Sequence, residues 1–180
     1  SEVYMRDPER PGLLETCRGF LSRFNKEVVL HVKVSYANAL ASLSREVLVL
    51  MKDVLLVDLL KNCVFNRKIG NNDPEVRKAS LRTIFKMVEK IGLSQMTHEN
   101  FGKIFDTQAL SIKDYTLDKR GDIGCIVREE TMNVYLDFLN LMVKEKEEKK
   151  DDPPKIISEL MDKVDLKKVI SGILTQILHP

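Results

Sequence analysis

Residues 73–92 read DPEVRKASLRTIFKMVEKIG, and this stretch carries every signal of an amphipathic helix with defined ends. Asp73 is a residue that caps helix N-termini, and Pro74 suits the first helical position, where a backbone N–H would be unpaired anyway. Apolar residues then keep helical spacing and form one stripe, namely Val76, Ala79, Ile84, Met87, Val88 and Ile91. Gly92 is a typical helix C-cap. The stretch predicts a helix over 74–91.

The same pattern recurs along the whole chain and predicts an all-α protein. Start signals of the same kind stand at Asp7-Pro8, Asn25-Lys-Glu27, Ser44-Arg-Glu46, Thr97-His-Glu99 and Asp152-Pro153. No run alternates with period two between turns. We predict helices near 8–24, 27–42, 45–66, 74–91, 98–113, 123–148, 154–163 and 165–178. They fall into four antiparallel pairs over 8–42, 45–91, 98–148 and 154–178. Helix 45–66 is apolar nearly all round, so we expect neighbours to cover it on several sides.

Composition restricts the class of protein. The 180 residues are 43% hydrophobic and 31% charged, with a net charge of +2. This balance argues against a dedicated nucleic-acid binder, and no apolar run is long enough to cross a membrane. Cys17, Cys63 and Cys125 are odd in number and far apart, which favours a reducing, cytoplasmic setting without disulfides or a zinc site. Ser1 stands where an initiator Met would, so we expect the chain to be part of a longer protein.

An internal repeat links two of the predicted helices. Asp73, Val76 and Arg77 recur as Asp122, Val127 and Arg128, with the two valines 51 residues apart. This pattern resembles the second helix of HEAT repeats, in which an Asp caps the helix, the Val enters the core between repeats and the Arg ties neighbouring repeats together. The resemblance implies an α-solenoid of about four HEAT-type helix pairs forming one segment, with 144–152 as a charged helix end and linker. Apolar surface is then expected at the first or last pair.

The segment before the second copy resembles a specific family. Residues 114–128 read DYTLDKRGDIGCIVR, and the residues that fit the family pattern are Tyr115, Thr116, Asp118, Arg120, Gly121, Asp122, Gly124, Val127 and Arg128. This stretch is similar to the opening of the C-terminal region of the tubulin-folding cofactor D family. Leu117 and Ile126 depart from it, because family members commonly carry Thr and Trp there. The resemblance implies a chaperone that binds β-tubulin and acts with other tubulin-folding cofactors and an ADP-ribosylation-factor-like small GTPase. It also implies a cytoplasmic, cytoskeleton-associated protein. The alternative is a generic HEAT-repeat scaffold for transport or signalling.

The loop 114–124 supplies the candidate partner-binding residues, which are Asp118, Lys119 and Arg120. Two roles remain open for them. The charged loop either contacts a partner, or Asp118 and Asp122 cap helices and pair with Arg120 or Arg128 to hold the loop in place. We favour the structural role for Asp122 and Arg128.

The sequence predicts no catalytic centre, no cofactor and no metal site. It contains none of the phosphate-binding, metalloprotease or hydrolase motifs, and its three histidines stand apart from cysteines and carboxylates. The spacing of Asp114, Asp118 and Asp122 does not match a calcium-binding loop. A contribution of Arg120 to GTP hydrolysis on a partner, as an arginine finger, is the most that the sequence allows.

Overall fold

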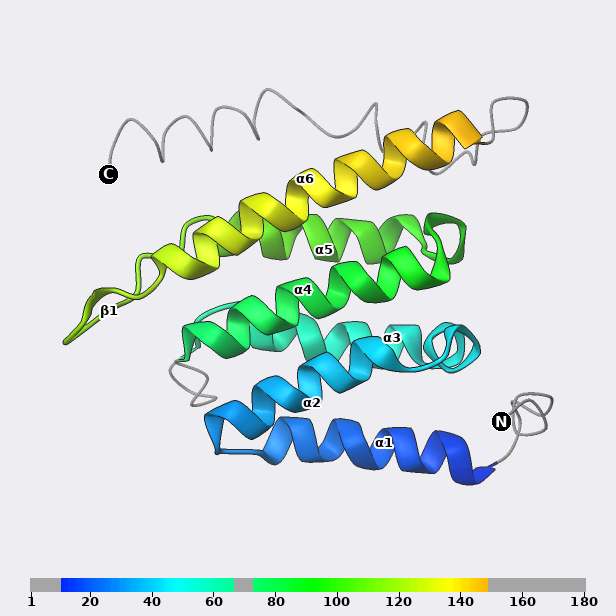
Figure 1. Cartoon of the computed structure of the whole chain (residues 1–180), viewed down its shortest axis with the longest axis horizontal. Coiled ribbons are helices and arrows are strands. Elements are labelled where there is room, and N and C mark those ends of the chain that lie inside the picture. Colours follow the sequence, from blue (N-terminus) through cyan, green and yellow to red (C-terminus); the bar gives the residue numbers. More distant parts are fainter. Residues whose placement is uncertain (1–10, 67–72, 149–180) are drawn as a thin grey trace.

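The computed structural model describes residues 11–66 and 73–148 and is all-α, as predicted (Figure 1). Its helices are α1 (Pro11–Lys26), α2 (Leu30–Ser42), α3 (Arg45–Cys63), α4 (Pro74–Ile91), α5 (His98–Ser111) and α6 (Cys125–Glu148), with a short 3-10 helix, η3 (Leu93–Gln95). Two strands of two residues each, β1 (Leu117–Asp118) and β2 (Gly121–Asp122), form a small hairpin between α5 and α6. The predicted pair 154–178 lies outside the described residues.

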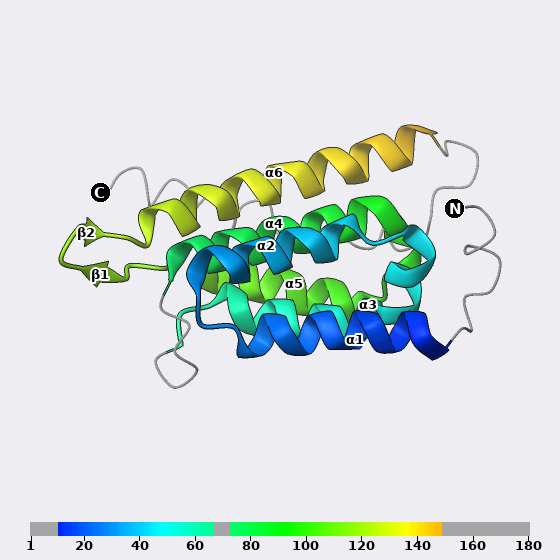
Figure 2. The same ribbon diagram turned by 60° about the horizontal axis from the view of Figure 1, so that its bottom comes forward.

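The helices lie in two layers, through which the chain passes alternately (Figures 1 and 2). Helices α1, α3 and α5 pack side by side in one layer, and α2, α4 and α6 do so in the other. Helix α4 is central, because it packs against α2 and α6 within its layer and against α3 across the layers. The three described pairs, α1–α2, α3–α4 and α5–α6, therefore stack in chain order.

Helix starts follow the predicted caps at three positions. The Asp73 carboxylate accepts the N–H of Glu75 at 2.8 Å, and Gly92 follows α4 with a φ of 90°. The hydroxyls of Ser44 and Thr97 accept backbone N–H groups at the starts of α3 and α5. These side chains satisfy donors that have no partner within the helix.

Several predicted boundaries are wrong. The start at Asn25 does not exist, because α1 continues to Lys26 and the Glu27 carboxylate accepts the N–H groups of Val28 and Val29 in the connector. Helix α3 ends three residues early, and α6 begins at Cys125 because the hairpin precedes it. The predicted helix end at 148 is right, because the first five residues of the charged run 144–152 belong to α6.

The core lies between the two layers and is centred on α4. Val76, Leu81, Ile84, Met87, Val88 and Ile91 of α4 are all buried. Phe85 meets Phe138 of α6 edge to face, with ring centroids 5.2 Å apart. Burial of this apolar surface is the main source of stability in such a fold.

Helix α3 is less covered than its sequence suggests. Leu50, Val54 and Val57 are exposed on the side of α3 that faces away from its buried residues. The expectation that neighbours cover this helix on several sides holds for only part of its surface. A helix of a two-layer stack has neighbours beside it and behind it, and its fourth side faces solvent.

Three polar contacts between neighbouring pairs join residues that are 46 to 48 positions apart in the chain. The Thr83 hydroxyl donates to the carbonyl of Ala37, 46 residues away, at 3.0 Å. The Asn100 amide donates to Asp53, 47 residues away, at 3.1 Å. Arg82 pairs with Glu130, 48 residues away, at 2.5 Å. These contacts join α4 to α2, α5 to α3 and α4 to α6.

Candidate functional site

The loop between α5 and α6 projects beyond one end of the helix stack (Figures 1 and 2). Leu117 pairs with Asp122, and Asp118 with Gly121, which leaves Lys119 and Arg120 as the turn. Gly121 has a φ of 101°, a conformation that side chains with a Cβ rarely adopt. The sequence predicts a charged loop here and does not predict the paired strands.

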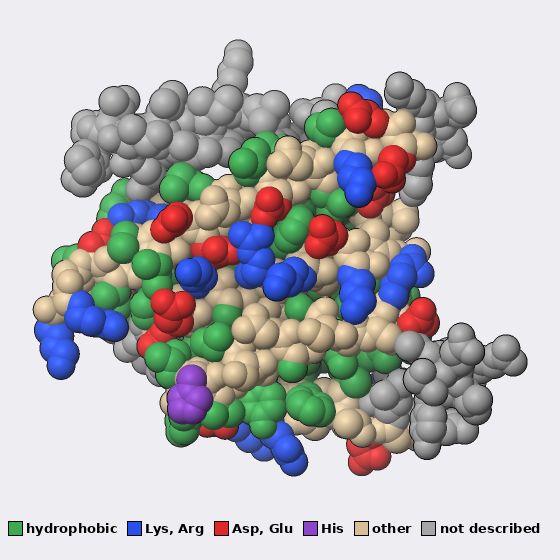
Figure 3. Space-filling model, viewed as in Figure 1, with side chains coloured by type: hydrophobic (Ala, Val, Ile, Leu, Met, Phe, Trp, Pro, Cys, Tyr) green, Lys and Arg blue, Asp and Glu red, His purple; other side chains and the backbone are tan. Residues whose placement is uncertain are grey.

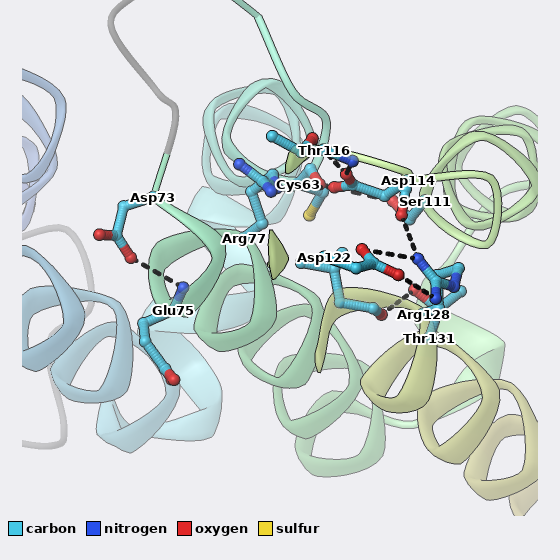
Figure 4. Close-up of polar contacts among 11 residues, drawn as sticks. Cys63, Asp73, Glu75, Arg77, Ser111, Asp114, Thr116, Asp122, Arg128 and Thr131 are labelled. Atoms are coloured by element: carbon cyan, nitrogen blue, oxygen red, sulfur yellow. Dashed lines mark hydrogen bonds and ion pairs between the residues drawn. The ribbon is translucent and has the colours of Figure 1, made fainter. Parts of the chain in front are cut away.

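Asp114 organises the base of this hairpin (Figure 4). Its Oδ1 accepts the backbone N–H of Thr116 at 3.1 Å and the Thr116 hydroxyl at 2.5 Å. Its backbone N–H donates to the carbonyl of Ser111 at the end of α5 at 3.2 Å. These bonds turn the chain out of α5 in one defined direction.

The other carboxylate oxygen of Asp114 meets a buried arginine from the preceding helix pair. Arg77 Nε lies 2.8 Å from Asp114 Oδ2, and the two side chains are 0% and 4% exposed. The contact is a buried ion pair. Burial lowers the pKa of Arg77, and the charge of Asp114 opposes that shift. The guanidinium also lies over the ring of Phe65, 5.5 Å from its centroid.

Arg77 therefore links two pairs, as its motif implies, but through an aspartate that the sequence analysis did not assign to it. Asp73, the aspartate of the same motif, caps its own helix as predicted and is not the residue that links Arg77 to the next pair. Val76 and Val127 are buried, which confirms their predicted place in the core. Nothing in the sequence signals that Arg77 pairs with Asp114, because 37 residues separate the two.

Arg128 holds the hairpin from the side of α6 (Figure 4). Its Nη1 donates to the carbonyl of Asp114 at 2.7 Å, and its Nη2 donates to Asp122 Oδ2 at 2.7 Å. The guanidinium stacks over Tyr115, 4.7 Å from the ring centroid. These bonds lower the pKa of Asp122 and raise that of Arg128. These contacts agree with the structural role favoured for Asp122 and Arg128, which is to hold the loop in place.

Gly124 allows the two ends of the loop to meet. A Cβ at this position would lie 2.1 Å from the carbonyl oxygen of Asp114, which is well inside contact distance. The N–H groups of Ile123 and Gly124 both donate to the carbonyl of Thr116, at 3.0 and 3.1 Å. The glycine of the motif is thus required by close approach of the backbone.

The turn of the hairpin carries the exposed residues. Arg120 donates to Asp118 through its backbone N–H at 2.7 Å and through Nε and Nη2 at 2.9 and 2.7 Å. This pairing lowers the pKa of Asp118. Asp118 lies in β1 and caps none of the described helices, but it pairs with Arg120, as the structural alternative for this residue expected. Lys119 is exposed and makes no ion pair with the described residues, and the side chain of Leu117 is 72% exposed.

A second charged link between pairs was not predicted. Arg82 of α4 contacts two carboxylates of α6, Glu130 at 2.5 Å and Asp137. On the face formed by α2, α4 and α6, Lys and Arg side chains over α4 lie beside Asp and Glu side chains over α6 (Figure 3). The face therefore carries both charges, and Lys and Arg side chains are visible at the outer end of the hairpin, where Arg120 is paired with Asp118.

No cluster of three His, Cys, Asp or Glu residues within 11–66 and 73–148 is arranged to hold a metal ion. The three loop aspartates are instead engaged by Arg77, Arg120 and Arg128. None of the helices in the described part of the chain has the length and apolar character needed to span a membrane.

Comparisons with known proteins leave the family open. No family model matches the chain, and no solved structure matches it. Any functional assignment therefore rests on the loop motif and on the geometry described above.

Proposed function

We propose that this chain is a segment of an α-solenoid built from HEAT-type helix pairs. Three observations support this architecture: the alternation of helices between two layers, the stacking of pairs in chain order, and the recurrence of contacts between pairs at separations of 46–48 residues. HEAT and related repeats have periods of roughly 40–47 residues. In a stack of repeated helix pairs, contacts between equivalent positions of neighbouring pairs join residues about one period apart.

The outer side of α6 supports a further pair beyond those described. Met132, Leu136, Leu139 and Val143 recur at steps of four and three, and each is at least partly exposed. Such a stripe is the surface that an additional helix would cover in a stack.

The function that the loop supports best is that of a tubulin-folding chaperone of the cofactor D type. Such a protein binds β-tubulin and assists assembly of the α/β-tubulin heterodimer in the cytoplasm, together with other tubulin-folding cofactors and an ADP-ribosylation-factor-like small GTPase. The motif over 115–128 carries this proposal. On this proposal the protein is not an enzyme in its own right and needs no cofactor, and its contribution to catalysis is at most that of Arg120 to GTP hydrolysis on a partner.

The geometry divides the motif into two parts with different tasks. Arg128, Asp122 and Gly124 hold the loop rigid, as the contacts at its base indicate. The turn, with Asp118, Lys119 and Arg120, is left to meet a partner, and Leu117 adds exposed apolar area beside it. A preorganised projection loses little conformational entropy on binding, which favours affinity.

The test is titration of fluorescently labelled α/β-tubulin with the 180-residue chain. We expect the Lys119→Ala/Arg120→Ala double variant to bind at least tenfold more weakly than the parent chain. The matched control is Lys103→Ala on α5, which removes an exposed lysine paired with Glu99 far from the hairpin. Equal binding by the parent chain, the double variant and the control would reject the hairpin as the tubulin contact.

A generic HEAT-repeat scaffold for transport or signalling remains the alternative, because the two-layer stack would serve any protein partner. Absence of tubulin binding by the parent chain, with the fold intact by circular dichroism, would favour this alternative over the chaperone.

A further inference from the structure

The exposed side of α3 carries an apolar stripe that nothing in the described residues covers. Leu50, Val54 and Val57 are 54%, 51% and 43% exposed. They lie at steps of four and three, so they follow one face of the helix. Of the other exposed apolar residues, Leu136 and Val143 also share one helix, α6, and the rest are spread over other helices, the connectors and the hairpin loop.

Residues of opposite charge lie at the two ends of this stripe. Glu46 precedes Leu50 by four residues, and Lys61 follows Val57 by four, so both lie on the same face as the stripe. Both are exposed. Lys61 is held near the helix by Asp58, with Nζ 3.4 Å from Oδ1, but its side chain remains 59% exposed. The face therefore reads acidic, apolar, apolar, apolar, basic over about 22 Å of helix.

This arrangement is self-complementary when one copy is reversed against another. The midpoint between Leu50 and Val57 coincides with the midpoint between Glu46 and Lys61, at the bond between Asp53 and Val54. A twofold axis through that point brings Leu50 of one copy against Val57 of the other. It also brings each Glu46 to the Lys61 of the second copy. Contacts of this reciprocal kind define an isologous dimer interface.

Asp53 lies beside this axis, where its two copies would carry like charges, but its side chain is bound to another helix. The carboxylate of Asp53 accepts the Asn100 amide of α5, with Oδ1 3.1 Å from Nδ2. This bond holds Asp53 toward the neighbouring helix, which leaves Val54 at the centre of the stripe.

We propose that α3 is a homodimerisation surface, on which a second copy of the chain packs its own α3 in antiparallel orientation. The steps of four and three match the spacing at which two helices interlock at a small crossing angle. The charge pattern favours the antiparallel mode, because a parallel pair would place Glu46 against Glu46 and Lys61 against Lys61.

The first experiment measures the mass of the chain by sedimentation equilibrium over a range of concentrations. We expect a reversible dimer for the parent chain and at least a tenfold larger dissociation constant for Val54→Lys, because two lysines then meet at the axis. The control is Leu136→Lys, which alters the exposed stripe of α6 and should leave the dimer intact. A parent chain that stays monomeric, or a dimer lost only with Leu136→Lys, overturns the proposal.

Charge exchange tests the orientation with variants that keep the apolar stripe. Glu46→Lys alone and Lys61→Glu alone each place like charges together, so each variant should dimerise more weakly than the parent chain. Mixing the two variants should restore dimers, because the lysine introduced into one chain then meets the glutamate introduced into the other. The native Lys61 and Glu46 meet at the opposite end of the same mixed dimer.

The variant with both changes should dimerise like the parent chain, because each introduced charge again faces its opposite. If neither the mixture nor the doubly changed chain recovers affinity, the antiparallel α3 interface is refuted, even where self-association persists.

Discussion

Replacing Asp114 with Asn should destabilise the fold severely, because it leaves the charge of Arg77 buried without a counterion. The substitution keeps Oδ1 as an acceptor for Thr116 and so changes mainly the contact with Arg77. The guanidinium has no route to solvent, since the Arg77 side chain is fully buried and burial already lowers its pKa. Removing one partner of a buried ion pair costs about 3–5 kcal/mol. Domains of ordinary stability unfold with about 5–15 kcal/mol, so this is a large share.

The assay is urea unfolding followed by helical circular dichroism, with the free energy of unfolding extrapolated to water. The matched control is Asp118→Asn, which breaks an Asp–Arg pair of the same loop at an exposed site and should not measurably change stability. A double variant with Arg77→Met and Asp114→Asn removes both charges. It should be more stable than the sum of the single effects predicts, by about 1–3 kcal/mol.

Two results would refute this account of the pair. One is an Asp114→Asn chain that unfolds at the same urea concentration as the Asp118→Asn control. The other is additive single effects in the double variant, which would show that Arg77 and Asp114 do not interact in the folded chain.

Three further predictions concern contacts that join the loop and the pairs. Gly124→Ala should lower the free energy of unfolding by about 2–4 kcal/mol in the same urea assay, because its Cβ would overlap the carbonyl oxygen of Asp114; unchanged stability would show that the loop base is loose. Asp122 has a pKa lowered mainly by Arg128, so its contribution is present above the pKa of an unfolded Asp and is lost as pH falls through its lower folded pKa. Asp122→Asn should therefore flatten the loss of thermal stability between about pH 5 and pH 2, and a parallel pH profile would contradict the ion pair. Arg82→Met should lower the free energy of unfolding by about 2 kcal/mol, because the mostly buried carboxylate of Glu130 loses its partner. Amide hydrogen exchange should then become faster in α6 and not in α1, and equal exchange in both helices would contradict the link between these pairs.

The sequence predicts the helices well, because their signals are local. Asp73 and Gly92 act within a few residues of their own helix, and the apolar spacing between them needs no knowledge of the neighbours. The prediction fails in the connector after α1. Asn25 has the composition of a helix start, but the preceding helix continues past it to Lys26.

The candidate site shows the same division. The pairing of Asp122 with Arg128, six residues apart, was within reach of sequence reasoning, and so was the need for glycine in the turn. The partner of Arg77 was not, because only the stacking of one pair on the next brings Asp114 to it. The exposed side of α3 was also missed. Its residues are apolar on all sides, and the pattern alone does not tell which side faces the other helices.

Because Arg77 is buried with Asp114, folding of the nascent chain depends on the order in which the two residues are synthesised. A ribosome completes α3 and α4 before it reaches Asp114, so the nascent chain must hold Arg77 either hydrated or enclosed as a lone cation. Closing that part of the core early is unfavourable, and the carboxylate that neutralises it arrives 37 residues later with the following hairpin. The pair α5–α6 thus delivers the charge that the pair before it needs to finish folding, and a nascent chain that ends before Asp114 leaves Arg77 without its counterion.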